Sequence, residues 1–212
     1  MKIALAGKIA CGKSTLAASI AEKIGGRRIG FADKVREVIE DLYGPGHHKD
    51  RRLLTGVGMG LRTVDPDTWL NVVLNRTTQS RENWVLDDLR FPNELHALKK
   101  NEWTIFRIDI GDALQESRIK SCYGDKATEH ATYTRHISET SLDDTPDDTF
   151  DYIISVRNNT DTNMEVYITS THKSVPQMSS PLTTIDSLAT HIVSLSAGKI
   201  VTQSTQRMHS SA

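Results

Sequence analysis

An eight-residue segment near the start of the chain has the residue types and spacing of a loop that binds polyphosphate. Residues 7–14 read Gly-Lys-Ile-Ala-Cys-Gly-Lys-Ser and fit the pattern G-x-x-x-x-G-K-[ST]. In such a loop, successive backbone N–H groups point inward and surround phosphate oxygens. Lys13 is expected to reach the β- and γ-phosphates, and the Ser14 hydroxyl to bind Mg²⁺. The predicted nucleotide-binding residues are Gly7, Lys8, Ala10, Cys11, Gly12, Lys13, Ser14 and Thr15.

The residues on either side of this loop predict the strand and the helix that its mechanism requires. Residues 2–6 form a short apolar run that ends at the first glycine of the loop, which is typical of a buried parallel strand. After the loop, apolar residues recur at helical spacing from Leu16 to Ile24. Gly25 and Gly26 then supply a stop signal. Strand, loop and helix therefore follow in the required order.

Apolar runs and helical periodicities alternate along the next part of the chain. Further strands are expected at 27–30, 84–88, 103–110 and 150–156, with amphipathic helices between them. This alternation predicts an α/β fold of the P-loop NTPase type, a parallel β-sheet with helices on both faces. Ligands bind such sheets at the carboxyl ends of the strands. The phosphate loop, Asp88 and the segment after Ile110 are expected to meet there.

Other segments have weaker signals. The alternating Gly56, Gly58 and Gly60 predict a flexible loop, and the polar, mostly basic residues 47–52 a solvated loop or helix start. An extra strand is expected at 165–169, followed by a helix over 182–193 that Gly198 ends. We therefore expect one domain over residues 1–200 and a disordered tail over 201–212.

The composition excludes several classes of protein. A length of 212 residues suits one α/β domain, and a net charge of −1 gives no basic surface on which to expect direct nucleic-acid binding. The two cysteines, Cys11 and Cys122, are expected to be reduced thiols in a cytoplasmic protein. No signal peptide is expected before the first strand. No apolar run approaches the ~18 residues of a membrane span, so no membrane association is expected.

A phosphate loop alone does not separate kinases, GTPases and motor ATPases. The sequence lacks the N-K-x-D segment with which GTPases read guanine, and motor ATPase domains are usually larger. Four segments resemble the deoxynucleoside monophosphate kinases of bacteriophages and large DNA viruses: 31–37 (FADKVRE), 65–69 (DPDTW), 88–94 (DLRFPNE) and 136–139 (HISE). The resemblance covers about residues 1–158 and is sharpest at 88–94.

The resemblance implies a nucleoside monophosphate kinase-like fold that uses ATP and Mg²⁺ to phosphorylate a dNMP to a dNDP. Asp88 would stand beside the Mg²⁺ with Ser14; Asp87 precedes it, and the following Leu-Arg-Phe favours Asp88. The catalytic groups would be Lys13 and Asp88, with Arg118 and Arg135 from a mobile lid at about 112–136. The acceptor nucleotide would contact Asp33, Arg36, Arg62, Trp69, Arg90, Asn93 and Glu94. No general base is expected, because the attacking phosphate oxygen is already anionic.

Alternatives remain open at this point. Asp88 could instead be an ordinary helix cap, and Trp69 could be a core residue. Arg36 could be a side chain that faces solvent. For the whole chain, one alternative is a kinase of another small phosphorylated metabolite, similar to phosphomevalonate kinase. Another is a non-catalytic nucleotide-binding regulator. The expected partners are small-molecule nucleotides. The sequence leaves open which bases are accepted and whether the protein is a homodimer.

Overall fold

The computed structural model of the chain describes residues 1–160, 163–171, 182 and 184–209. Its centre is a six-stranded sheet with the strand order β2-β3-β1-β4-β5-β6. Five strands are parallel: β1 (Lys2–Gly7), β2 (Arg27–Ile29), β3 (Trp84–Leu89), β4 (Thr104–Ile110) and β5 (Tyr152–Thr160). The edge strand β6 (Asn163–Ser170) pairs antiparallel with β5. This order places β1, and with it the phosphate loop, in the middle of the sheet.

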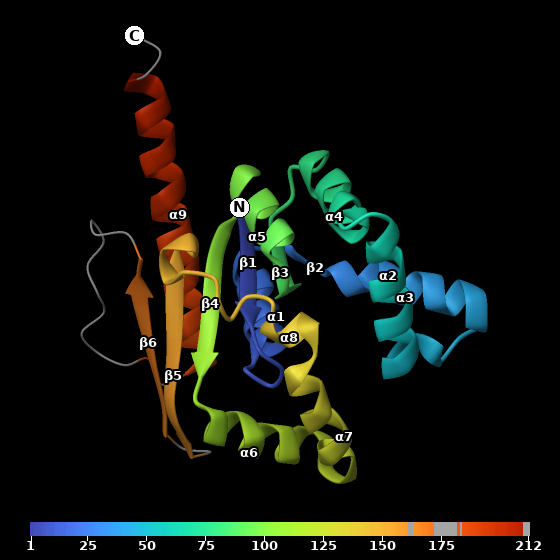
Figure 1. Cartoon of the computed structure of the whole chain (residues 1–212). Coiled ribbons are helices and arrows are strands. Elements are labelled where there is room, and N and C mark those ends of the chain that lie inside the picture. Colours follow the sequence, from blue (N-terminus) through green and yellow to red (C-terminus); the bar gives the residue numbers. More distant parts are fainter. Residues whose placement is uncertain (161–162, 172–181, 183, 210–212) are drawn as a thin grey trace.

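Helices cover both faces of the sheet (Figure 1). Helices α1 (Lys13–Lys23) and α9 (Ile185–His209) pack on one face, and α2 (Phe31–Tyr43), α4 (Thr68–Thr78) and α5 (Pro92–Lys100) on the other. Because successive strand residues point to opposite faces, Val85 lies in the first core and Leu86 in the second. The predicted α/β fold, a parallel sheet with helices on both faces, is confirmed.

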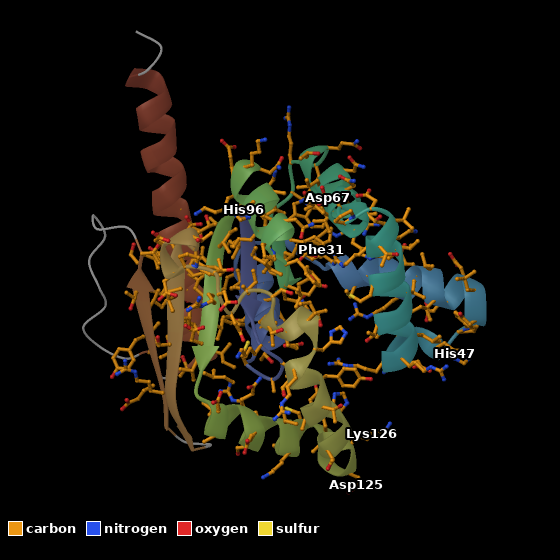
Figure 2. The ribbon with its side chains drawn as sticks, in the orientation of Figure 1. Phe31, His47, Asp67, His96, Asp125 and Lys126 are labelled. Carbon is orange, nitrogen blue, oxygen red and sulfur yellow. The ribbon has the colours of Figure 1, made fainter. Side chains whose placement is uncertain are left out.

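Two helical arms extend from this core on the side of the phosphate loop. The first contains α2, the 3₁₀ turn η1 (His47–Lys49) and α3 (Arg51–Val64). The second contains α6 (Asp112–Tyr123), η2 (Gly124–Lys126), α7 (Ala127–Thr132), η3 (Tyr133–Arg135) and α8 (Ile137–Thr140), and η4 (Asp147–Thr149) leads from it to β5. Figure 2 shows His47 at the outer end of the first arm and Asp125 and Lys126 at the tip of the second. The arms thus border the carboxyl ends of the strands.

The glycines at 56, 58 and 60 lie inside helix α3, so the expected flexible loop is wrong. The Asp50 carboxylate caps this helix by accepting hydrogen bonds from Arg52 N and Leu53 N. Apolar side chains of α3, including Leu53 and Val57, pack against the second core. Burial of that face offsets the low helix propensity of glycine.

The C-terminal helix also differs from its predicted bounds. It begins at Ile185, since Leu182 makes a β-bridge with Val166 instead. It continues past Gly198 to His209, because Gly198 does not adopt the positive φ that ends helices. The helix therefore includes the first part of the expected tail, and residues 210–212 lie outside the described residues. Among the described residues, no helix combines the length and the apolar character of a membrane-spanning segment.

Candidate active site

The phosphate loop has a backbone conformation that its sequence makes possible. Gly7 has φ 145°, and a Cβ at this position would lie 2.8 Å from both Cys11 Sγ and the Ile108 carbonyl oxygen. Gly12 has φ 99°, and Ala10 is left-handed with φ 62°. These left-handed residues curl the loop so that it joins β1 to the first turn of α1.

Lys13 lies folded over this loop. Its Nζ donates hydrogen bonds to the carbonyl oxygens of Gly7 at 2.6 Å and Lys8 at 2.7 Å. Burial lowers the pKa of the Lys13 ammonium. The positive charge is therefore held at the hollow of the loop, while Ser14 and Thr15 are exposed on the first turn of α1.

A cavity of about 690 Å³ opens in front of the loop, between the two helical arms. Its wall contains more cations than carboxylates. The cations are Lys13, Arg28, Arg36, Arg51, Arg62 and Arg90, and the carboxylates are Asp33, Asp87, Asp88 and Glu139. The volume is in the range of small-ligand sites, and the excess of arginines suits an anionic ligand.

The neighbouring carboxylates of Asp87 and Asp88 have different partners. Asp88 accepts hydrogen bonds from the backbone N–H groups of Phe31 and Ala32, each at 2.9 Å, and so caps helix α2. Burial raises its pKa to about 6, although these N–H groups oppose the shift. Asp87 instead pairs with Arg28 at the mouth of the cavity.

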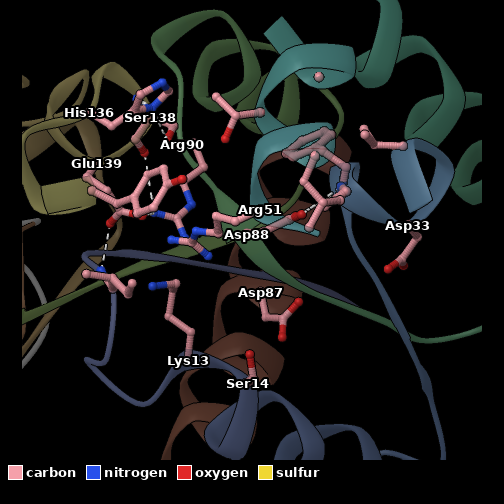
Figure 3. A pocket seen from close by; sticks show the side chains of 18 of the residues that line it. Lys13, Ser14, Asp33, Arg51, Asp87, Asp88, Arg90, His136, Ser138 and Glu139 are labelled. Carbon is pink, nitrogen blue, oxygen red and sulfur yellow. Dashed lines mark hydrogen bonds and ion pairs between the residues drawn. The ribbon is translucent and has the colours of Figure 1, made fainter. Parts of the chain in front are cut away.

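Of these two carboxylates, it is Asp87 that faces Ser14 (Figure 3). A register shift between β1 and β3 pairs Ala4 with Leu86 but Ala6 with Leu89, which inserts one extra residue at this point of β3. The geometry therefore does not support the expectation that Asp88 stands beside the metal. The structure instead shows Asp88 as the cap of helix α2.

Two predicted acceptor residues lie together on α2. Asp33 accepts a hydrogen bond from Gly30 N at 2.7 Å and another from Arg36 Nη1 at 2.8 Å. Both side chains line the cavity and are partly open to solvent. Their positions agree with a contact to a ligand in the cavity.

Trp69 and Arg62 line the cavity from more buried positions. Trp69 is 2% exposed, and its Nε1 donates to the Gly58 carbonyl at 2.9 Å, which joins α4 to α3. The Arg62 guanidinium lies 4.3 Å from the ring centre of Phe91 and pairs with Glu94 at 2.6 Å. Trp69 is thus a core residue with one side on the cavity.

Glu94 and Asn93 are not among the residues that line the cavity, so the structure gives no support to their expected contact with the acceptor. Glu94 is fully buried and accepts hydrogen bonds from Arg90 N and Phe91 N, each at 3.0 Å, as well as the Arg62 ion pair. Burial raises its pKa to about 7, opposed by the Arg62 charge. Asn93 donates to the Asp67 carboxylate at 2.7 Å. Both residues fix the elements that present the arginines.

The second arm contains the segment 112–136 that was expected to be a lid, and the two arginines predicted from it are not among the residues that line the cavity. Arg118 donates from Nη1 to the Cys11 carbonyl at 3.0 Å and so supports the loop from outside. Arg135 is exposed on η3. The arm instead presents Tyr123 and Tyr133 to the cavity.

Sequence reasoning missed further wall residues, among them Arg28, Arg51 and Tyr133. The Arg51 guanidinium lies 4.7 Å from the ring centre of Tyr133 and so connects the two arms. Arg51 was part of a basic stretch that was expected to be solvated. No local signal shows that the two arms converge, because the contact joins residues far apart in the chain.

The chain was compared with known proteins, and the solved structures described next are distantly similar to it. No protein-family model matches the chain, and no curated protein matches it significantly. A gluconokinase from Sinorhizobium meliloti 1021 has a TM-score of 0.43 and 17% identity, covering 74% of this chain and 83% of its own. A shikimate kinase from Acinetobacter baumannii, in complex with shikimate, has a TM-score of 0.49 and 17% identity over 93% of each chain. A shikimate kinase from Aquifex aeolicus vf5 has a TM-score of 0.35 and 16% identity, and the match covers 62% of this chain and 82% of that kinase. Similarity at this level says nothing about the substrate of this chain.

Proposed function

We propose that this chain is an ATP- and Mg²⁺-dependent kinase whose acceptor is a nucleoside monophosphate, with deoxynucleotides as the expected acceptors. The observation that supports it is the placement of the phosphate loop and five arginines around one cavity. The loop alone suffices for one polyphosphate. The arginines that line the same cavity suit a second phosphorylated ligand.

The residues around the loop fit a magnesium nucleotide. Ser14 and Asp87 face each other beside Lys13 and would hold the ion together with phosphate oxygens. Magnesium needs few protein ligands when phosphates complete its shell. The absence of a cluster of three or more acidic, His or Cys residues from the described parts of the chain is therefore compatible with this assignment. When bound, the ion neutralises charge on the transferred phosphoryl group.

The remaining wall suits a nucleotide acceptor better than an aliphatic phosphate. Phe91, Tyr123 and Tyr133 line the cavity as partly exposed rings, beside the buried Phe31 and Trp69, and an accessible aromatic ring can pack against a planar base. Arg36 and Arg90 are positioned to bind its phosphate. Transfer then depends on alignment and charge neutralisation, while the second arm excludes water that would hydrolyse ATP.

A coupled assay of ADP release tests this proposal. The panel contains dTMP, dGMP, dCMP, dAMP, the four ribonucleotides, phosphomevalonate and shikimate, the last as an acceptor without phosphate. Turnover with one or more deoxynucleotides, lost in Lys13→Ala, is the expected result. Turnover with phosphomevalonate alone would identify the other kinase class. ATP binding without turnover of any acceptor would indicate the nucleotide-binding regulator.

A further inference from the structure

Glu139 joins the phosphate loop to the acceptor side of the cavity. Its Oε2 accepts a hydrogen bond from Ile9 N in the loop at 2.6 Å, and its Oε1 pairs with Arg90 Nη1. The Glu139 side chain is only 2% exposed, although it lies between the large cavity and a second one of about 300 Å³. The carboxylate thus bridges two elements that are 81 residues apart (90 − 9).

The contacts of Arg90 are arranged on one edge of its guanidinium. Within the described residues, Nη1 makes the protein contacts of this group, to the Glu139 carboxylate and to the Ser138 carbonyl at 3.3 Å. Figure 3 shows the guanidinium beside the Lys13 ammonium. A guanidinium held by one edge presents its remaining N–H donors in a fixed direction, which is the requirement for paired contacts with a phosphate.

The charge of Glu139 has a second effect at this point. The Lys13 ammonium and the Arg90 guanidinium are like charges that lie beside each other in Figure 3. The Glu139 carboxylate pairs with Arg90 and so offsets the repulsion between the two cations.

We infer that Glu139 is a positioning residue that fixes Arg90 against the phosphate loop, so that the free edge of Arg90 binds the acceptor phosphate next to Lys13. This inference rests on the proposed kinase function. It differs from an alternative in which the Glu139 carboxylate merely occupies the loop in place of a phosphate and leaves when ATP binds. In that case removal of the carboxylate would tighten ATP binding.

The test uses Glu139→Gln, Arg90→Gln and the double variant, each assayed for acceptor and ATP KM and for kcat. Loss of a charge-assisted contact that orients Arg90 should raise the acceptor KM of Glu139→Gln about tenfold, which is about 1.4 kcal/mol. The ATP KM should change less than about threefold. The effect of Glu139→Gln should disappear in the Arg90→Gln background, because it acts through Arg90. Additive effects, or an ATP KM lowered by Glu139→Gln, would overturn the inference.

Two further variants separate positioning from folding. Asp151→Asn alters a buried carboxylate that accepts from Ile105 N at 2.8 Å, far from the cavity, and should lower stability without changing the acceptor KM. Glu139→Asp keeps the charge but is one methylene too short to hold both partners. It should show the same acceptor defect as Glu139→Gln; a normal acceptor KM would overturn the positioning role.

Failure of the proposed function can be told apart from failure of this inference. If no monophosphate is turned over, inorganic phosphate can be titrated calorimetrically in the presence of a non-hydrolysable ATP analogue. Phosphate binding about tenfold weaker in Glu139→Gln, with no further loss in the double variant relative to Arg90→Gln, would support the inference. Equal phosphate affinity in the wild type and Glu139→Gln would overturn it.

Discussion

The buried ion pair between Arg62 and Glu94 gives a quantitative prediction about stability. Glu94 is fully buried, and Arg62 is 13% exposed and stacks on Phe91. Arg62→Met keeps most of the stem packing but removes the charge that stabilises the Glu94 carboxylate. Breaking a buried pair commonly costs ~3–5 kcal/mol, because the remaining charge is uncompensated.

Glu94 can limit this cost by binding a proton. Its pKa is about 7 in the folded protein against the ordinary value of 4.5, so its contribution to stability is largest below pH 4.5 and falls as pH rises toward 7. Without Arg62 this pKa rises further. The free energy of unfolding that is lost because Glu94 has no ion-pair partner cannot exceed the cost of keeping Glu94 protonated. That cost is about 1.4 kcal/mol per pH unit above 7. This gives ~2 kcal/mol at pH 8.5, less than ~0.5 at pH 7 and almost nothing at pH 5.5.

Loss of the stacked guanidinium adds ~0.5–1 kcal/mol at every pH. Arg62→Met should therefore lower the free energy of unfolding by ~1 kcal/mol at pH 5.5 and by ~3 kcal/mol at pH 8.5. Urea titrations followed by tryptophan fluorescence measure both values. In a Glu94→Gln background the effect of Arg62→Met should not depend on pH. The reasoning is refuted by an effect that is constant between pH 5.5 and 8.5 in the presence of Glu94.

Four other predictions concern the loop and the two carboxylates. Lys13→Ala should lower kcat at least ~100-fold, measured by ADP release, with an unchanged thermal midpoint. Asp87→Asn should raise the Mg²⁺ concentration for half-maximal activity at least ~10-fold, whereas Asp88→Asn should leave it within ~2-fold. Because the Asp88 pKa is raised from 3.8 to about 6, the Asp88 contribution to wild-type stability should fall as pH rises across this window, by up to ~3 kcal/mol. Asp88→Asn should remove this part of the slope and leave the part that Glu94 contributes between pH 4.5 and 7. Gly7→Ala should cost more than ~3 kcal/mol in urea unfolding, because its Cβ would lie 2.8 Å from the Ile108 carbonyl.

Opposite outcomes would contradict specific parts of the structure. Near-normal turnover by Lys13→Ala would remove the loop lysine from catalysis. A stronger metal defect in Asp88→Asn than in Asp87→Asn would restore Asp88 as the metal-facing carboxylate. A stable Gly7→Ala protein would mean that the loop does not pass as close to Cys11 and Ile108 as described.

The order of the elements could be predicted from the sequence because it depends on local signals. The apolar run before Gly7, the helical spacing after Ser14 and the runs at 84–88 and 103–110 each correspond to an observed strand or helix. The helix α3 was missed because its three glycines have low local helix propensity, and only burial of Leu53 and Val57 against the core compensates.

The candidate site was predictable where a single segment forms it and not where packing assembles it. Residues 7–14 are one continuous segment, which joins β1 to the first turn of α1, so their sequence alone located it. The choice between Asp87 and Asp88 depends on a register shift between two strands that are distant in the sequence. Asn93 and Glu94 have the residue types of ligand contacts, yet they support the neighbouring elements.

The sequence by itself determined the phosphate loop, the alternation of strands and helices and the kind of ligand that such a loop can bind, because these follow from residue types and spacing within short segments. Only the tertiary structure decided which arginines share the cavity and which carboxylate faces Ser14. It alone brought Glu139 to Ile9, 130 residues away in the chain, and thereby to Arg90. Such contacts depend on how whole elements pack and on strand register, and no pattern within one segment specifies them.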